Sequence, residues 1–264
     1  MLKINNISKT FNPGTVNEKK ALNNLSLHLE KGDFVTILGS NGAGKSTLFN
    51  AIAGTFPVDQ GDIRLDGVNI TSQPDFKRSK FIGRLFQDPL KGTAPNMTIE
   101  ENLALAYMRA SSHTSPFSMI SKADRKVFRD RLAMLELGLE DRMNHPVGLL
   151  SGGQRQALTL LMATLVTPKL LLLDEHTAAL DPATAEKVLE LTKKIVAEND
   201  ITCLMITHNI PSALALGNKT IMKKDGSIVM ELAGQERSTM TTEKLLKAFH
   251  QQGMSNDRIL FSAE

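Results

Sequence analysis

The chain has 264 residues, of which 41% are hydrophobic and 22% charged, and this ordinary globular composition argues against a disordered chain. The formal net charge of +3 is too small to indicate a nucleic-acid binder, in which a basic stripe is expected, so no nucleic-acid partner is predicted. The single cysteine, Cys203, excludes an internal disulfide and fits a reducing compartment. No signal-peptide pattern and no bilayer-spanning apolar stretch is seen, so we expect partners to supply any membrane part.

The first third of the chain alternates strand and helix patterns. Short strands are predicted at residues 2–7, 22–29, 34–38, 63–65 and 81–86. The apolar run at 34–38 leads into a glycine-rich loop, and a helix is expected from about Lys45 to Ala53, just before Gly54. This order predicts a buried strand that is followed by a loop and a helix.

The middle of the chain is helical. A capping-box pattern at residues 98–101 opens a helix through about Arg109, and a Ser-rich loop is predicted at 111–121. A second helix is predicted at 122–137, ending at Gly138. We interpret the region as a helical insertion between two α/β stretches.

The α/β pattern then resumes toward the C-terminus. Strands are predicted at residues 170–173, 201–207, 220–222 and 228–232, and helices at 182–197, 211–216 and 242–251. Asp225 and Gly226 predict the turn of a hairpin. Strands that alternate with helices predict an α/β fold with a mostly parallel sheet. Whether residues 252–264 form an ordered tail stays open.

One loop matches the phosphate-binding pattern GxxxxGK[ST]. Its residues are Gly39, Ser40, Asn41, Gly42, Ala43, Gly44, Lys45, Ser46 and Thr47. Glycines let backbone amides converge on phosphate oxygens, Lys45 adds a positive charge, and Ser46 offers a hydroxyl to Mg²⁺. The alternative is a plain strand-to-helix turn. The motif alone indicates a nucleoside triphosphate, since kinases and GTPases share it.

A pair of carboxylates follows the apolar run at residues 170–173. The run predicts a buried parallel strand, whose carboxyl end is where α/β sheets place ligands. Asp174 is therefore a candidate to hold Mg²⁺, and Glu175 is a candidate general base that polarises the attacking water. The alternative is a strand that runs into a solvated turn.

The segment from Leu150 to Gln154 narrows the class. Ser151 is the expected N-cap of a helix that runs to about Val166. Two glycines expose backbone amides at the N-terminus of this helix, which suits the binding of an anion. The alternative is an ordinary helix capped by serine. Here the sequence resembles the ABC ATPase family across nearly the whole chain. The resemblance implies a P-loop NTPase (RecA-like) core with a mostly parallel sheet, an antiparallel β subdomain and a helical subdomain. The implied boundaries are one ABC ATPase domain at 1–264, its core at 1–89 and 156–264, and the signature subdomain at 90–155.

The resemblance implies roles for four more residues. Phe11 resembles the aromatic residue on which adenine stacks, and Gln87 the glutamine that senses the γ-phosphate and Mg²⁺. Asp181 resembles the D-loop aspartate, and His208 the switch histidine that contacts the γ-phosphate. Each residue also has an ordinary interpretation. Phe11 could be a core or surface aromatic residue and Gln87 a polar loop residue. Asp181 could be only a helix N-cap, and His208 a histidine whose hydrogen bonds are satisfied locally.

The same resemblance implies an ATPase that uses ATP and Mg²⁺ and works as a head-to-tail dimer of two copies. ATP held at Lys45 of one copy is contacted by the signature residues of the other, and each copy carries both surfaces. The implied sets are Glu175, His208 and Gln87 for catalysis, Ser46, Gln87 and Asp174 for Mg²⁺, and Ser151, Gly152, Gly153 and Gln154 for the contact across the dimer.

One residue departs from the family pattern, because His176 follows Glu175 where the family usually has proline. The pattern around it resembles importer ATPases that pair with permeases of the branched-chain amino-acid type, which suggests amino-acid uptake. The chain is then expected to be cytoplasmic and peripheral on the membrane, with a separate permease and an extracytoplasmic substrate-binding protein. The alternative is a non-transport ABC ATPase of the translation-factor or DNA-repair type. The cargo, the direction of transport, the permease and the role of His176 stay open.

Overall fold

The computed structural model describes residues 1–110 and 120–251, so most of the predicted loop at 111–121 and the tail at 252–264 lie outside the described residues. The chain divides into two compact units. The first comprises Met1–Arg78 and Thr202–Glu264, and the second Ser79–Ile201. Each unit has its own hydrophobic core and is described by itself.

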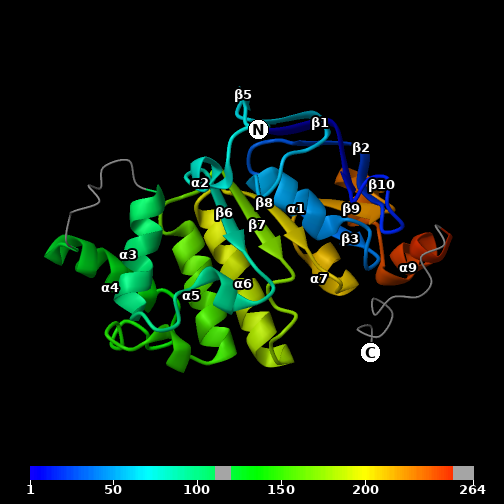
Figure 1. Ribbon diagram of the computed structural model, residues 1–264. Helices are drawn as coiled ribbons and strands as arrows, with labels where there is room; N and C mark the ends of the chain where they lie inside the picture. The colour runs from blue at the N-terminus through cyan, green and yellow to red at the C-terminus, as the bar shows by residue number, and fades with distance from the viewer. Residues whose placement is uncertain (111–119, 252–264) are drawn as a thin grey trace. The chain divides into compact units, whose positions relative to one another are not determined.

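The first unit contains an antiparallel sheet, drawn in blue and cyan in Figure 1, with the strand order β2-β1-β4-β5. Its strands are β1 (Leu2–Phe11), β2 (Lys19–Leu29), β4 (Gln60–Leu65) and β5 (Val68–Asn69). Leu2 of β1 lies opposite Leu29 on one side and Leu65 on the other, and all three side chains are buried. The first two strands are longer than predicted, because pairing between them continues to Phe11 and Lys19, beyond the residues that alternate in polarity.

The first unit also contains three parallel strands, two of which are followed by a helix at their carboxyl ends. The strand order is β10-β9-β3-β8, and β3 pairs in parallel with both of its neighbours. The elements are β3 (Phe34–Gly39), α1 (Lys45–Ala53), α2 (Asp75–Arg78), β8 (Thr202–Ile206), α7 (Ile210–Ala215), β9 (Lys219–Lys224) and β10 (Ser227–Ala233). Every residue of β3 is buried, as the apolar run predicted. The predicted hairpin turn at Asp225 and Gly226 is confirmed between β9 and β10.

Two C-terminal helices complete the first unit, namely α8 (Gly234–Ser238) and α9 (Thr242–Gln251). Leu245 and Phe249 of α9 are buried against Ile210 of α7 and Met222 of β9, and α9 matches the helix predicted at 242–251. The Arg237 guanidinium of α8 donates hydrogen bonds to carbonyl oxygens at the end of α7, so it satisfies groups that a helix terminus leaves open.

The second unit combines one pair of parallel strands with a group of helices, drawn in cyan to yellow in Figure 1. The elements are β6 (Ile82–Leu85), η1 (Pro89–Gly92), α3 (Ile99–Ala110), α4 (Lys122–Ala133), η2 (Val147–Leu149), α5 (Gly152–Thr164), β7 (Leu170–Asp174) and α6 (Pro182–Glu198). Phe128 of α4, Leu103 of α3 and Leu158 of α5 meet in the core of the helical part. The predicted α/β class, with parallel strands, an antiparallel sheet and helices, is confirmed.

One helix ends earlier than predicted. The sequence suggested a helix through residue 137, but α4 ends at Ala133. Glu136 has φ 55°, in the left-handed region, and this breaks the helical path before Gly138. Leu135 and Leu139 are buried on either side of this turn, so core packing overrides the helical pattern of the sequence. Among the described residues, no helix is long and apolar enough to span a bilayer.

Candidate functional site

The glycine-rich loop connects buried β3 to α1, as predicted. Gly44 precedes the helix with φ 84°, and a Cβ atom there would lie 2.1 Å from the carbonyl oxygen of Ala21. Only glycine is compatible with both the conformation and the close approach. The helix therefore begins at Lys45 with its positive end at the loop, an arrangement that suits an anion.

The side chain of Lys45 folds back over the same loop and is buried. Its Nζ donates hydrogen bonds to the carbonyl oxygens of Gly39, at 2.6 Å, and Ser40, at 3.0 Å. The ammonium is thus held at the loop by backbone groups. Ser46 and Thr47 follow in the first turn of α1.

Phe11 ends β1 and forms an aromatic pair that the sequence analysis missed. Its ring packs edge-on against Phe56, with 5.3 Å between ring centroids, and both rings are partly exposed. The Nζ of Lys9 lies 5.8 Å from the centroid of the Phe11 ring. Phe56 follows the glycine that ends α1, but no local pattern separates it from an ordinary loop aromatic.

His208 follows β8, the strand next to β3. Ile37 of β3 lies opposite Ile206, and the amide of Thr207 donates to the carbonyl oxygen of Ile37 at 3.2 Å. The carboxyl ends of the two parallel strands therefore meet at one edge of the sheet, so the first unit brings the glycine-rich loop and the segment of His208 to the same edge.

Asp174 and Gln87 come to a common edge of the second unit in the same way. Leu85 of β6 lies opposite Leu173 of β7, and both strands run in parallel toward these residues. Asp174 is the last residue of β7 and is buried, whereas Gln87 is exposed just beyond β6. The two predicted metal ligands of this unit therefore leave neighbouring strands at the same end.

Glu175 has φ 46°, an uncommon conformation for a residue with a side chain. The turn that it begins is closed by a 3.0 Å hydrogen bond from the amide of Ala178 to the carbonyl oxygen of Glu175. The candidate base is therefore held in a tight turn directly after a buried strand. Backbone strain of this kind clusters at functional sites.

Arg84 is a charged neighbour of this edge that the sequence analysis missed. Its guanidinium carbon lies 4.5 Å from the centroid of the Phe86 ring. Burial lowers the pKa of Arg84, and the nearby charge of Asp174 acts in the opposite direction. Arginine within a strand has no sequence signature, so only the fold brings this charge close to Asp174.

His176, the departure from the family pattern, is buried and packs toward α6. Its Nε2 lies 3.2 Å from Thr192 Oγ1, and that hydroxyl donates its own hydrogen to the carbonyl oxygen of Val188 at 2.7 Å. Burial lowers the pKa of His176 to about 4, so the ring is neutral at neutral pH. Since the hydroxyl hydrogen is used, the ring carries its hydrogen on Nε2 and donates to Thr192.

Ser151 caps α5, as predicted. The amide of Gln154 donates to Ser151 Oγ, and the amide of Ser151 donates to Gln154 Oε1, each at 3.2 Å, which completes a capping box. A Cβ atom at Gly153 would lie 2.2 Å from Thr184 Cγ2, so this glycine permits the close approach of the start of α6. Ser151 and Gly152 are exposed.

Asp181 caps α6 and is exposed. The amide of Thr184 donates to Asp181 Oδ1 at 3.0 Å, and Pro182 occupies the first helical position. Hydrogen bonds from Thr184 lower the pKa of Asp181. The N-cap interpretation is therefore confirmed, while the D-loop role stays a prediction.

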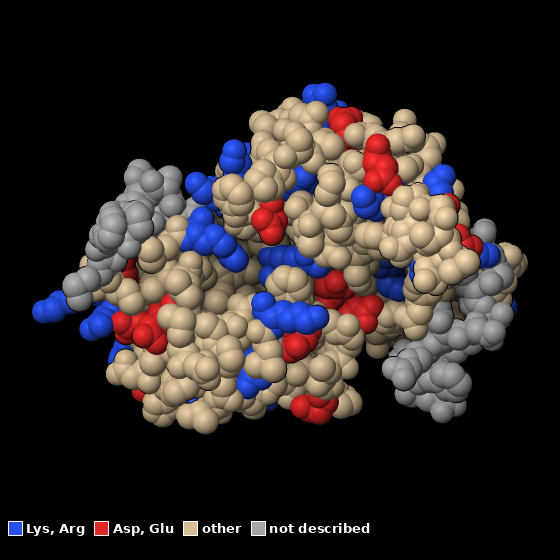
Figure 2. Space-filling view, in the orientation of Figure 1, with Lys and Arg blue, Asp and Glu red and all other residues tan. Residues whose placement is uncertain are grey.

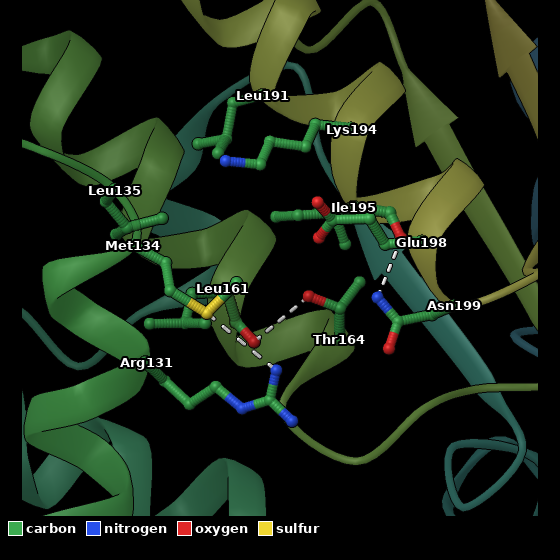
Figure 3. A pocket seen from close by; sticks show the side chains of 10 residues that line it. All are labelled: Arg131, Met134, Leu135, Leu161, Thr164, Leu191, Lys194, Ile195, Glu198 and Asn199. Carbon is green, nitrogen blue, oxygen red and sulfur yellow. Dashed lines mark hydrogen bonds between the residues drawn. The ribbon is translucent and has the colours of Figure 1, made fainter.

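A separate recess lies among α4, α5 and α6 of the second unit (Figure 3). Leu161, Leu191 and Ile195 give it a largely apolar lining, and Asn199 beside it donates to the carbonyl oxygen of Ile195 at 2.8 Å. None of the residues that line this recess is a predicted site residue. It therefore plays no part in the candidate chemistry.

Comparison with known proteins agrees with these features. The family model for the ABC transporter matches residues 22–178. The chain therefore belongs to the ABC transporter family, in which it is an ATP-binding subunit. This supports the transporter interpretation rather than a translation factor or a DNA-repair ATPase.

The relatives are ATP-binding subunits of transporters. The tyrosine transport ATP-binding protein of Clostridioides difficile (strain R20291) is 44% identical over 250 residues, covering 94% of this chain and 98% of the relative. The phosphonates import ATP-binding protein PhnC of Lactococcus lactis subsp. cremoris (strain SK11) is 32% identical over 257 residues, covering 96% of this chain and 100% of the relative. An ATP-binding cassette solved as a dimer in a post-hydrolysis state with ADP and Pi has a TM-score of 0.76 and 33% identity, covering 88% of this chain and 98% of that chain.

Proposed function

We propose that this chain binds ATP with Mg²⁺, hydrolyses ATP to ADP and phosphate, and thereby drives solute transport through separate permease subunits. Domains of this family are ATPases. The observation that carries the proposal is the loop between β3 and α1. Its conformation requires glycine at Gly44, and Lys45 Nζ is held against the loop.

The proposed nucleotide contacts divide between the two units. In the first unit, Phe11 stacks on adenine, the amides from Gly39 to Thr47 surround the phosphates, and His208 contacts the γ-phosphate. In the second unit, Glu175 accepts the proton of the attacking water. Its turn after β7 supports this role because the backbone of Glu175 is held directly after the end of a buried strand.

The proposed Mg²⁺ ligands are Ser46, Gln87 and Asp174. A hydroxyl, an amide oxygen and a carboxylate are hard oxygen donors, which fit Mg²⁺, and a site with one carboxylate and substrate phosphates is usual for this ion. Asp174 is buried at a strand end, which suits a fixed ligand. Mg²⁺ supplies charge neutralisation on the phosphates when it is bound.

A second copy of the chain is proposed to complete the site. Ser151, Gly152, Gly153 and Gln154 of one copy would contact the ATP that the other copy binds. The exposed and capped start of α5 supports this, since its amides can face an anion from outside. Asp181 would lie near the same contact as the D-loop residue. A related cassette is dimeric with ADP and Pi.

The proposed setting is the cytoplasmic face of the cell membrane. Here the chain would bind a permease and work with an extracytoplasmic substrate-binding protein. Import of an amino acid is the proposed transport activity, because the relative from Clostridioides difficile is a tyrosine transport ATP-binding protein and is similar over nearly the whole chain. Lys and Arg are interspersed with Asp and Glu on the face in Figure 2, which favours a protein partner over nucleic acid.

An ATPase assay on the purified chain, alone and with its permease, tests the proposal. The wild type should release phosphate only when Mg²⁺ is present, and Lys45→Ala should lose most nucleotide binding. Normal ATP affinity in Lys45→Ala would contradict the phosphate-loop assignment.

Affinity capture from detergent-solubilised membranes tests the setting. A stoichiometric polytopic membrane protein should co-purify with the tagged chain. Capture of ribosomes or DNA without any membrane protein would contradict it.

A further inference from the structure

Lys223 is a buried lysine that none of the roles above uses. It lies on β9, opposite Gly39 at the end of β3, and its relative exposure is 0%. Its Nζ donates a hydrogen bond to the carbonyl oxygen of Ala43, inside the glycine-rich loop. The sequence pattern gave no reason to expect a lysine here, because the strand is otherwise apolar at its centre.

The same carbonyl group is held from a second direction. The amide of Gly226, in the β9–β10 turn, donates to the Ala43 oxygen at 3.2 Å. The structure contains no cis peptide bonds among its described residues. A trans peptide places its C=O and N–H on opposite sides, so the amide of Gly44 points away from β9 and Lys223. Lys223 and Gly226 thus fix the direction of one loop amide.

The position of Lys223 also concentrates charge at the loop. Burial lowers the pKa of Lys223 to about 7, the charge of Lys45 lowers it further, and Asp225 opposes both effects. Lys19 of β2 is a third cation here, since its Nζ would lie 3.2 Å from a Cβ atom at Gly42. A bound triphosphate would favour the charged form of Lys223, because opposite charges attract strongly at a buried site.

We propose that Lys223 is a positioning residue of the phosphate loop, which turns the Gly44 amide toward bound triphosphate and adds a buried positive charge behind the loop. The inference rests on the ATP-binding function and requires no hydrolysis. It gives β9 a part in nucleotide binding, although that strand carries none of the predicted site residues.

The test compares ATP affinity in Lys223→Met and the wild type from pH 6 to pH 9, by equilibrium titration with Mg²⁺ present. Methionine has a similar length and no charge. At pH 6 the variant should bind ATP about tenfold more weakly, because a charge-assisted hydrogen bond is lost. The difference in ATP affinity between the variant and the wild type should become smaller as the pH rises, because the lysine of the wild type loses its proton. The titration of ATP itself is common to both proteins and cancels in the comparison.

Ile221→Ala is the matched control, because Ile221 is a buried residue of the same strand. It should lower the melting temperature and leave the pH dependence of ATP affinity unchanged. If Lys223→Met does not fold, Lys223→Gln, a neutral donor, supplies the same comparison. Wild-type affinity in the neutral variant, or a loss that is constant with pH and shared by the control, would overturn the proposal. Failure of the wild type to bind ATP would instead overturn the ATP-binding function, on which the proposal rests.

Discussion

Asp33, just before β3, shows how one buried carboxylate connects two segments of the first unit, the turn before β3 and the start of β9. It accepts hydrogen bonds from Lys219 Nζ at 2.8 Å, Asn218 Nδ2 at 2.7 Å and the amide of Glu30 at 2.8 Å. Burial raises the pKa of Asp33, but these hydrogen bonds together outweigh it, and the pKa is lowered. The ionised form is therefore favoured by folding.

We expect Asp33→Asn to lower the free energy of unfolding by about 2 kcal/mol at pH 7, since charged hydrogen bonds are lost. A carboxyl group whose pKa is lower in the folded state than in the unfolded state stabilises the folded protein at pH values above its unfolded pKa. This stabilisation is lost as the pH falls through the folded pKa. The difference from wild type should thus shrink below about pH 4. Urea unfolding at several pH values measures it. Asp62→Asn, at a partly exposed site, should have a much smaller effect, and a pH-independent difference for Asp33→Asn would refute this account.

The hydrogen bond between His176 and Thr192 leads to a second prediction at this scale. Thr192→Val keeps the shape of the side chain but leaves the buried Nε2–H without its acceptor, which should cost about 1–3 kcal/mol of stability. Thermal melting measures the loss. Thr192→Ser keeps the hydroxyl and should lie close to wild type, so equal melting temperatures for the two variants would contradict the assigned hydrogen bond.

At the scale of elements, two helices begin with the same device. Ser121 with Asp124 caps α4, and Ser151 with Gln154 caps α5, each through a capping box. Both serines are exposed. The two helices therefore provide a comparison in which the local structural role is the same and the proposed function differs.

We expect Ser121→Ala and Ser151→Ala each to destabilise the protein by about 1 kcal/mol, the usual effect of losing an N-cap. Only Ser151→Ala should also reduce ATPase activity and ATP-dependent dimerisation, because only that helix is proposed to face nucleotide. Melting curves and phosphate release measure the two effects. A similar loss of activity in both variants would mean that Ser151 is merely a cap.

The elements that the sequence predicted well are those with strong local signals. The helix at Lys45–Ala53 lies between glycines, and Asp181 with Pro182 marks the start of α6. The short helices α2 and α8 were missed because a few residues carry no periodicity. The predicted end of α4 was wrong because the burial of Leu135 and Leu139 determines the turn that follows the helix. This burial depends on segments that are distant in the sequence.

At the scale of the whole molecule, the candidate residues of both units lie in segments that follow strands far apart in the sequence. Motif order singled out Lys45, Glu175 and His208 as candidates, since each follows an apolar run. Arg84 and Lys223 could not be predicted in this way. Each becomes important only because strand pairing brings it beside a predicted site residue.

The whole-molecule prediction concerns Glu175→Gln. If two copies enclose ATP and Glu175 activates water, this variant should hydrolyse ATP with little turnover and accumulate as an ATP-bound dimer. Size-exclusion chromatography with ATP and Mg²⁺ should show the dimer, and ADP should not produce it. Unchanged turnover would rule out Glu175 as the general base.

The close contact between Gly153 and Thr184 has a genetic consequence. The two residues start successive helices, and a methyl group at 153 would collide with Thr184 Cγ2, whereas Thr184 Oγ1 lies 3.8 Å away. Serine at 184 lacks the offending methyl group but keeps the hydroxyl. A suppressor screen that starts from Gly153→Ala should therefore select smaller residues at position 184. Residues 153 and 184 should also covary among related sequences.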